Sequence, residues 1–263
     1  MNKHILWLVW LISPALFADH VPGHAKLEWG VGLAALTLPD YRGSTREQSQ
    51  LLPLPYIKYR GYRLRVDDGV EGRFFQTPDL LLSISGNGSL PSSNDNPERA
   101  GMEKLDATVE IGPSLEYRVM HDEKTSLWLE LPLRFAMNVE DSFDSIGSVF
   151  SPRLAWRKPA QKKFDWKFRL AAGPLYSDEN YNGYYYSVKT SEVTPTRPAF
   201  TAQDGFSGYR IDFTYSRRMG QYWFGGFVRY DNISGSEIED SPLVITDSNF
   251  TAGIGFAWVL SEK

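Results

Sequence analysis

The clearest pattern in the chain is a pair of alternating segments within residues 108–137, joined by a polar turn at 121–124. Each segment places apolar residues on one parity and polar residues on the other, and this period of two is typical of a β-strand. The apolar positions are Val109, Ile111, Leu115, Tyr117 and Val119, followed by Leu127, Leu129, Leu131, Leu133, Phe135 and Met137. We therefore predict a long β-hairpin.

The hairpin is longer than soluble proteins usually require. Ordinary strands have about five or six residues, whereas a tilted strand that crosses a bilayer needs roughly nine to eleven. The length favours a membrane-spanning hairpin, but the hairpin alone leaves a soluble sandwich or lipocalin-like barrel open as the alternative.

The same alternation recurs along the chain. It predicts strands over 26–36, 150–157, 166–173, 209–216, 222–231 and 250–258. Segment 51–59 contains Pro53 and Pro55, which have no backbone N–H to donate to a neighbouring strand. Because the two prolines are two residues apart, the missing N–H groups lie on the same side, so this strand must be bulged, edge-like or at the rim. Between residues 62 and 82 the pattern fits either three strands, 63–66, 70–75 and 80–87, or one bent strand and one straight strand.

The connections between these strands alternate in length. Those at 121–124, 158–163 and 218–221 are short, whereas 89–104, 177–205 and 232–248 are long, which is typical of an outer-membrane barrel. Aromatic residues also gather at both ends of the predicted strands, as membrane interfaces favour. We therefore predict an all-β fold, a single antiparallel transmembrane β-barrel of twelve strands, with ten as the alternative.

The N-terminus resembles a secretory signal peptide. Lys3 precedes an apolar run at 5–12, Pro14 interrupts it, and Ala18 offers a small residue for cleavage. A membrane anchor is the alternative, but the apolar stretch 5–17 is shorter than the roughly twenty residues that a spanning helix needs. We predict a signal peptide at 1–18, export with cleavage after Ala18, and a barrel over 19–263 in a Gram-negative outer membrane.

Composition narrows the class further. The chain has 28 basic and 32 acidic residues, a formal charge of −4 that is too mild for a nucleic-acid-binding protein. It has no cysteine, which excludes a disulfide framework. The mean hydropathy of −0.35 fits a barrel in which only alternate strand residues meet lipid.

The sequence offers little for catalysis. Beyond the predicted signal peptide the histidines are His20, His24 and His121, and none lies in a predicted strand interior or a long loop where a general base would be useful. No ligand spacing indicates a transition-metal site. Asp40 and the run 67–69 suggest turns rather than a calcium loop. We predict no enzymatic activity and no cofactor.

The polar parity of the strands carries many charges that a barrel would direct into its lumen. They could form the wall of a selective pore, or they could pair and fill a small barrel, and we favour the second interpretation. These residues are Glu110, Glu116, Arg118, Glu130, Arg134, Arg153, Arg157, Lys167, Arg169, Arg210, Asp212 and Arg229.

The long segment 177–205 lacks a clear period and contains three consecutive tyrosines, Tyr184, Tyr185 and Tyr186. Loops of this length within a compact unit are usually functional. We therefore single out these tyrosines as aromatic residues of an outer loop.

Three stretches resemble motifs of the MipA/OmpV family of Gram-negative outer-membrane proteins. They are 39–44 followed by 52–56, the tyrosine-rich run 184–188, and 239–243 together with the last strand. The resemblance keeps the order over nearly the whole mature chain. One departure is that five residues follow Trp258, whereas such barrels usually end on an aromatic residue.

The resemblance implies a scaffold or adaptor that links the outer membrane to murein-synthesising and murein-hydrolysing enzymes. The alternative is a narrow porin-like channel for small solutes through the charged lumen. The partners to expect are outer-membrane lipid, and either periplasmic murein enzymes or small solutes.

Overall fold

The structure is a computed structural model that describes residues 26–60, 64–66, 70–93, 95–139, 143–162 and 164–262. The predicted signal peptide, His20, His24 and the run 67–69 lie outside the described residues. The described strands are β1 (Lys26–Pro39), β2 (Glu47–Arg60), β3 (Leu64–Val66), β4 (Val70–Gln76), β5 (Leu80–Ser89), β6 (Thr108–His121), β7 (Ser126–Asn138), β8 (Ser145–Phe150), β9 (Arg153–Lys158), β10 (Trp166–Ser177), β11 (Gly205–Met219), β12 (Tyr222–Asn232) and β13 (Ser248–Glu262). Helix α1 (Glu179–Tyr186) and the short 3₁₀ helix η2 (Thr190–Glu192) lie between β10 and β11.

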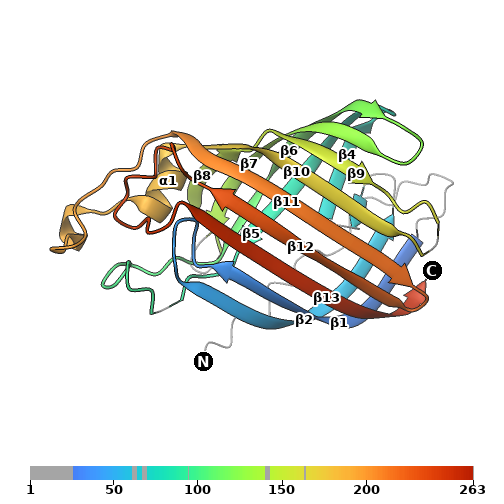
Figure 1. Cartoon of the computed structure of the whole chain (residues 1–263), viewed down its shortest axis with the longest axis horizontal. Coiled ribbons are helices and arrows are strands. Elements are labelled where there is room, and N and C mark those ends of the chain that lie inside the picture. Colours follow the sequence, from blue (N-terminus) through green and yellow to red (C-terminus); the bar gives the residue numbers. More distant parts are fainter. Residues whose placement is uncertain are drawn as a thin grey trace.

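The strands form one antiparallel sheet that closes into a barrel (Figure 1). The last strand β13 pairs with the first strand β1, and β10 pairs with β11, so the pairing runs around a ring. Both β8 and β9 pair with β7 and with β10, so these two strands share one place in the ring. The part of the chain that the structure describes therefore has twelve strand positions, and the twelve-strand prediction is confirmed.

The hairpin of β6 and β7 shows an inverted burial pattern. Glu110, Glu116 and Glu130 are buried, whereas Ile111 and Tyr117 on the opposite parity are exposed, the latter at 50%. A soluble sheet would bury its apolar face, whereas a membrane barrel turns that face toward lipid. The predicted hairpin and its parity are confirmed.

The two ends of the barrel differ in their connections. Only 122–125, 159–165 and 220–221 link β6 to β7, β9 to β10 and β11 to β12, whereas 90–107, 178–204 and 233–247 form long loops at the other end. Figure 1 shows α1 and the long loops gathered at one end of the barrel. Exposed aromatic side chains lie toward both ends, among them Tyr117 and Trp258 near the short turns, and Phe135 and Phe250 toward the long loops. We call the two ends the turn end and the outer end.

Two predicted strands differ from the structure. The segment 150–157 was predicted as one strand, but the structure interrupts it at Ser151 and Pro152, between β8 and β9. Pro152 has no N–H group to donate to a neighbouring strand, which explains the interruption. The last strand does not end at Trp258 but continues to Glu262, paired with β1 at Glu28. Between residues 62 and 82, the three-strand alternative is the one that the structure contains.

Strand β2 is edge-like, one of the options that its prolines allowed. It pairs with β1 over its whole length without a register shift. On its other side, within the described residues, it pairs with β3 only at Tyr59 and Arg60.

No helix in the described residues is long and apolar enough to span a membrane.

Candidate functional site: the charged inner wall and the outer cap

The charges singled out from the sequence lie on the inward parity of their strands. Their neighbours on the opposite parity, such as Leu154, Leu170 and Ile211, are exposed on the outer surface of the barrel. Strands β6, β7, β9, β10, β11 and β12 carry Glu110, Glu116, Arg118, Glu130, Arg134, Arg153, Arg157, Lys167, Arg169, Arg210, Asp212 and Arg229.

Glu130 on β7 is the centre of this network. Arg153 Nε and Arg169 Nη2 each donate to Glu130 Oε2 at 2.6 Å, and Arg157 Nη2 donates to Glu130 Oε1. Arg157 also reaches Glu116 Oε2 at 2.5 Å. The Glu130 side chain is only 3% exposed, so its charge depends on these three arginines for compensation.

A second group of ion pairs lies closer to the outer end. Arg229 Nε donates to Asp212 Oδ1 at 2.8 Å, and Arg153 Nη1 lies 4.0 Å from Asp212 Oδ2, which connects this group to Glu130. Arg210 Nε donates to Asp231 Oδ1 at 2.8 Å. Sequence reasoning missed Asp231, although its inward parity on β12 was available as a signal.

Two predicted charges pair differently from the rest. Arg134 Nη1 lies 3.9 Å from Glu110 Oε2, and both side chains are buried. Arg118 Nη2 instead reaches Asp79, 2.7 Å away, at the turn end. The guanidinium groups of Arg118 and Arg157 also lie over the ring of Trp128, at 5.8 and 4.8 Å from its centroid.

The inner wall keeps a positive excess and contact with solvent. The predicted set holds eight basic and four acidic side chains, and Asp231 is a fifth acidic one, which leaves a formal excess of three positive charges among these residues in a chain whose net charge is −4. The arginines around Glu130 remain 22–28% exposed, so they are not sealed by packing. The geometry therefore combines paired charges with guanidinium groups that remain partly accessible from the lumen.

The opposite part of the inner wall carries an aromatic and apolar cluster, beside an ion pair in which Arg218 Nε lies 3.4 Å from Glu28 Oε2. On β12 the ring of Trp223 lies over Gly225 and Gly255, and the ring of Phe227 lies over Gly253, where an added Cβ would come within 2.5 Å of the ring. The ring centroids of Tyr56 on β2 and Trp223 are 5.6 Å apart, and Leu54 packs against the cluster that contains Tyr56. The alternation along β13 places Gly253 and Gly255 on the inward parity, but only the structure shows that they make room for aromatic rings.

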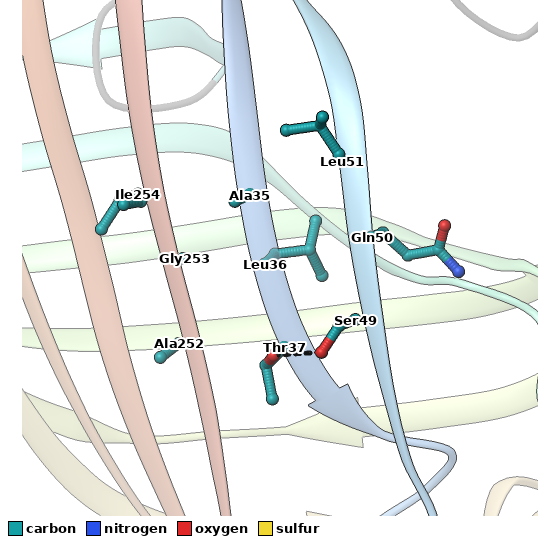
Figure 2. A pocket seen from close by; sticks show the side chains of 9 residues that line it. All are labelled: Ala35, Leu36, Thr37, Ser49, Gln50, Leu51, Ala252, Gly253 and Ile254. Atoms are coloured by element: carbon teal, nitrogen blue, oxygen red, sulfur yellow. Dashed lines mark hydrogen bonds between the residues drawn. The ribbon is translucent and has the colours of Figure 1, made fainter.

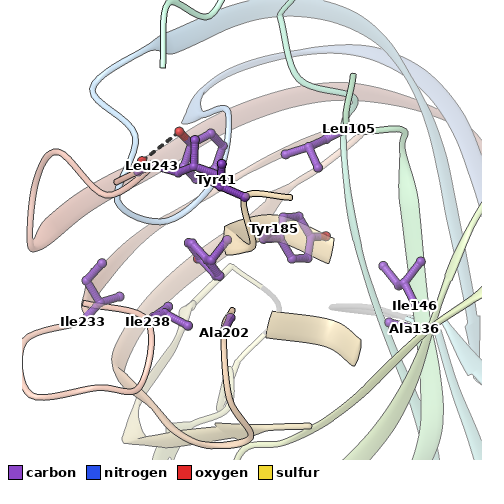
Figure 3. Close-up of a cluster of buried hydrophobic side chains, with 11 residues drawn as sticks. Tyr41, Leu105, Ala136, Ile146, Tyr185, Ala202, Ile233, Ile238 and Leu243 are labelled. Carbon is purple, nitrogen blue, oxygen red and sulfur yellow. Dashed lines mark hydrogen bonds between the residues drawn. The ribbon is translucent and has the colours of Figure 1, made fainter. Parts of the chain in front are cut away.

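A cluster of buried apolar residues lies at the outer end, and we call it the outer cap (Figure 3). Its residues come from the long loops, from α1 and from the walls β7 and β8, so the cluster joins segments from around the ring. The buried members are Tyr41, Leu105, Ala136, Ile146, Tyr185, Tyr186, Val188, Ala202, Ile233, Ile238 and Leu243.

Hydrogen bonds in the outer cap connect the three stretches that carry the family resemblance. Tyr41 Oη donates to the carbonyl oxygen of Leu243 at 2.8 Å, and Tyr186 Oη donates to that of Arg42 at 3.0 Å. Ser241 Oγ donates to the carbonyl oxygen of Tyr186 at 2.7 Å. Motifs far apart in the sequence therefore build one structure.

The three tyrosines singled out from the sequence belong to α1. Tyr185 and Tyr186 are buried in the outer cap, while Tyr184 packs against it and accepts a hydrogen bond from the Asp106 N–H at 2.9 Å. Burial raises the pKa of all three hydroxyls above the ordinary value of 10. They therefore stay protonated at neutral pH.

Helix α1 also touches the charged inner wall. Asp178 caps its N-terminus by accepting from the Tyr181 N–H at 2.8 Å, and Ser148 Oγ on β8 donates to the same carboxylate at 2.7 Å. Tyr181 Oη then donates to Glu110 Oε1 at 3.0 Å. The helix thus ties the outer cap to the inner network.

Asp40, at the turn between β1 and β2, organises the neighbouring loop between β5 and β6. Its carboxylate accepts from the Ser93 N–H at 2.9 Å, from Asn96 Nδ2 at 2.8 Å, and from Gln48 Nε2 at 2.5 Å. Burial would raise the pKa of Asp40, but these hydrogen bonds outweigh it and lower the pKa below the ordinary 3.8.

Replacing Asp40 should loosen this loop. In Asp40→Asn the side-chain amide replaces one acceptor oxygen with an NH2 group, which would face the N–H donors that now bind the carboxylate. We expect the free energy of local opening of the segment 90–107 to fall by about 1–3 kcal/mol. Since the folded pKa is lowered, the wild-type stabilisation is complete above pH 3.8 and disappears as the pH falls through the folded pKa. Hydrogen–deuterium exchange of this segment at pH 7 measures the effect, with 233–247 as the reference. Equal exchange in both proteins would refute this role.

A hollow in the barrel wall lies where β13, β1 and β2 approach the outer end (Figure 2). Its rim includes Thr37 and Ser49, whose hydroxyl oxygens are 2.7 Å apart. Ala35, Leu51 and Ile254 contribute apolar surface, and no charged side chain lines it. We assign no chemistry to this hollow.

Among the described residues, neither a metal site nor a histidine placed as a general base is evident. His121 ends β6 at the turn end and is exposed there. Across the described ranges, no group of three or more His, Cys, Asp or Glu side chains is arranged to hold a metal ion.

Comparisons with known proteins place the chain among outer-membrane proteins. The family model described as "MltA-interacting protein MipA" matches residues 31–260. The putative outer membrane protein YiaT of Escherichia coli K12 is 27% identical over 244 residues, covering 89% of this chain and 91% of YiaT. Outer membrane protein Omp26La of Vibrio anguillarum is 30% identical over 208 residues, covering 76% and 75%. Among solved structures, a bacterial polysaccharide outer membrane secretin aligns with a TM-score of 0.43 and 9% identity over 92% of this chain and 100% of its own.

Proposed function

The chain belongs to the MltA-interacting protein MipA family of outer-membrane β-barrel proteins, and we propose that it is a narrow, capped passage for small anionic solutes. The observation that carries this proposal is the inner wall of partly exposed arginines around Glu130, with its excess of positive charge. Positive side chains that line a passage lower the free energy of an anion inside it and raise that of a cation. The passage needs no catalytic group.

The outer cap bears on how such a passage would work. Tyr186 is 1% exposed and packs edge-on against Tyr41 at 6.1 Å between ring centroids. A cluster of this kind across the outer end restricts axial flow. The proposal therefore includes low conductance in the resting protein and higher conductance when the cap is weakened.

Planar-bilayer recordings under a KCl gradient test this proposal. We expect small, anion-selective currents from the wild type and several-fold larger currents with the same sign of selectivity from Tyr186→Ala, because the cap loses a buried ring. Lys167→Glu reduces the inner excess by two charges and should weaken anion preference. Lys124→Glu, the same change in the turn between β6 and β7, serves as the control and should not. Cation-selective currents, or no current from either the wild type or Tyr186→Ala, would contradict the proposal.

A second candidate function is an adaptor for murein enzymes, favoured by the description of the family itself. On this hypothesis the turn end faces the periplasm and the partner binds there, where residues 122–124 and 159–162 are exposed. Co-purification of the detergent-solubilised protein with a purified lytic murein transglycosylase tests it. Binding should disappear when 122–125 is replaced by a two-residue Asn-Gly turn. An unchanged complex, or no complex with the wild type, would eliminate this surface as the adaptor.

A further inference from the structure

Aromatic rings gather on the outer surface of β10, β11 and β12 toward the turn end. Leu170 on β10 is exposed, so Phe168 and Trp166 on the same parity also point outward. Their partners across the ladder, Tyr215 and Arg217 on β11, share that face. The neighbouring rings lie 5.9–6.2 Å apart between centroids. We call this group the aromatic patch, and its members are Trp166, Phe168, Phe213, Tyr215 and Phe224.

Two cationic side chains lie over rings of the aromatic patch. The guanidinium carbon of Arg217 is 5.5 Å from the centroid of Trp166, and Lys158 Nζ is 5.4 Å from that of Phe168. Lys158 pairs with Phe168 from β9, whereas Arg217 pairs with Trp166 from β11, so the cations flank β10 on its two sides. Since neighbouring strands are about 4.8 Å apart, the two backbones are about 10 Å apart, which is close enough for both side chains to reach one anion above β10.

The positive charge of these two side chains faces away from the lumen. Arg217 Nε donates to the carbonyl oxygen of Phe164 at 2.7 Å, which holds the guanidinium at the turn end. Across the described ranges, neither Lys158 nor Arg217 forms an ion pair with a carboxylate, in contrast to the inward arginines around Glu130. The outer surface therefore presents two cations without an acidic partner among the described residues.

The depth of the aromatic patch matches a membrane interface. Lys158 is the last residue of β9 and Trp166 is the first residue of β10, on either side of the connection 159–165. Aromatic rings, lysine and arginine are favoured at this depth, where their polar groups meet lipid headgroups and their apolar parts meet the hydrocarbon. Because outer-membrane barrels have their short turns in the periplasm, the aromatic patch belongs to the periplasmic leaflet.

We propose that the aromatic patch and its two cations bind one phospholipid with a net negative headgroup from the periplasmic leaflet. Its phosphate lies between the Lys158 ammonium and the Arg217 guanidinium, and its acyl chains follow Phe213 and Leu170 toward the midplane. A zwitterionic headgroup carries its own ammonium group toward the same cations and is bound less well. This site is on the outside of the barrel, so it goes beyond the proposed passage and does not depend on it.

Native mass spectrometry of the protein in micelles tests the headgroup preference. Dioleoyl phosphatidylglycerol and dioleoyl phosphatidylcholine have the same chains, and at equal concentrations we expect the first bound lipid to be phosphatidylglycerol by about tenfold. Lys158→Gln with Arg217→Gln should reduce this preference to less than about twofold. The control, Lys104→Gln with Lys124→Gln, removes the same charge from exposed connections and should keep the preference. Heat-modifiable gel mobility verifies that each variant is a folded barrel.

Photo-crosslinking of the wild type locates the bound lipid without a variant. The probe is phosphatidylglycerol with a diazirine near the start of one acyl chain, in nanodiscs of phosphatidylcholine. We expect its adducts on Phe168 and Phe213 to exceed those on Tyr117 and Trp258 several-fold; these two are exposed aromatic residues toward the same end, on β6 and β13. The same photolipid with a phosphocholine headgroup should label all four residues about equally.

Three results would overturn the inference. The first is a wild type that retains the two lipids equally, and the second is a preference that survives the loss of Lys158 and Arg217 or disappears in the control variant. The third is a pattern of adducts that does not depend on the headgroup, which would make the aromatic patch an ordinary part of the apolar outer surface.

Discussion

Leu131→Arg should destabilise the inserted barrel by about 2–4 kcal/mol, the cost of a guanidinium on the lipid face near the midplane. Leu131 lies in the middle of β7, opposite Leu115 on β6, and both side chains have the outward parity. Its chain neighbours Glu130 and Pro132 are buried inside. No water is available at this depth to solvate the new charge.

Urea unfolding of protein refolded into lipid vesicles, followed by heat-modifiable gel mobility, measures this change. Leu131→Met is the matched control, because it keeps an apolar side chain of similar volume and should cost less than about 1.5 kcal/mol. If the arginine variant unfolds at the same urea concentration as the methionine variant, the outward parity of β7 is wrong.

Glu130→Gln should also be strongly destabilising, for a different reason. The Glu130 carboxylate forms ion pairs with Arg153, Arg157 and Arg169, and its removal leaves three guanidinium groups without their shared anion. Breaking a fully buried pair costs about 3–5 kcal/mol, and because these arginines are about a quarter exposed we expect about 2–4 kcal/mol. The variant should still insert, since its outer surface is unchanged.

A double-mutant cycle isolates this effect from the loss of packing. Glu130→Gln combined with Arg153→Gln removes one of the uncompensated charges, so the pair should cost less than the sum of the two single variants. The same urea unfolding assay gives all four stabilities. Additive costs, or a single variant as stable as the wild type, would show that Glu130 does not hold the network together.

The sequence by itself determined the wall of this barrel. The period of two in β6, β7 and β13 specifies which side chains share a face, because successive strand residues point to opposite sides of a sheet. Charges at Glu110, Glu116 and Glu130 mark the face that lipid cannot accept. Pro53 and Pro55 limited β2 to a bulged, edge-like or rim strand before any partner was known, since a missing N–H is a local property of the residue.

Local pattern alone did not locate the interruption at Pro152. The alternation from Phe150 to Trp156 persists across it, because side-chain parity and backbone pairing are separate properties. The missing N–H of Pro152 interrupts this strand because β8 and β9 pair on both sides, with β7 and with β10, and the local pattern does not show how many neighbours a strand has.

Only the tertiary structure decided which charges meet and what closes the outer end. Parity places Glu130 inside the lumen, but its contacts with β9 and β10 depend on the stagger between strands, which closure of the ring sets. The hydrogen bond from Tyr41 to Leu243 spans 202 residues of sequence, and the loops that contain these residues show no regular alternation of apolar and polar residues. Loop positions follow from packing against distant segments, so their arrangement becomes defined only when the barrel has brought its outer ends together.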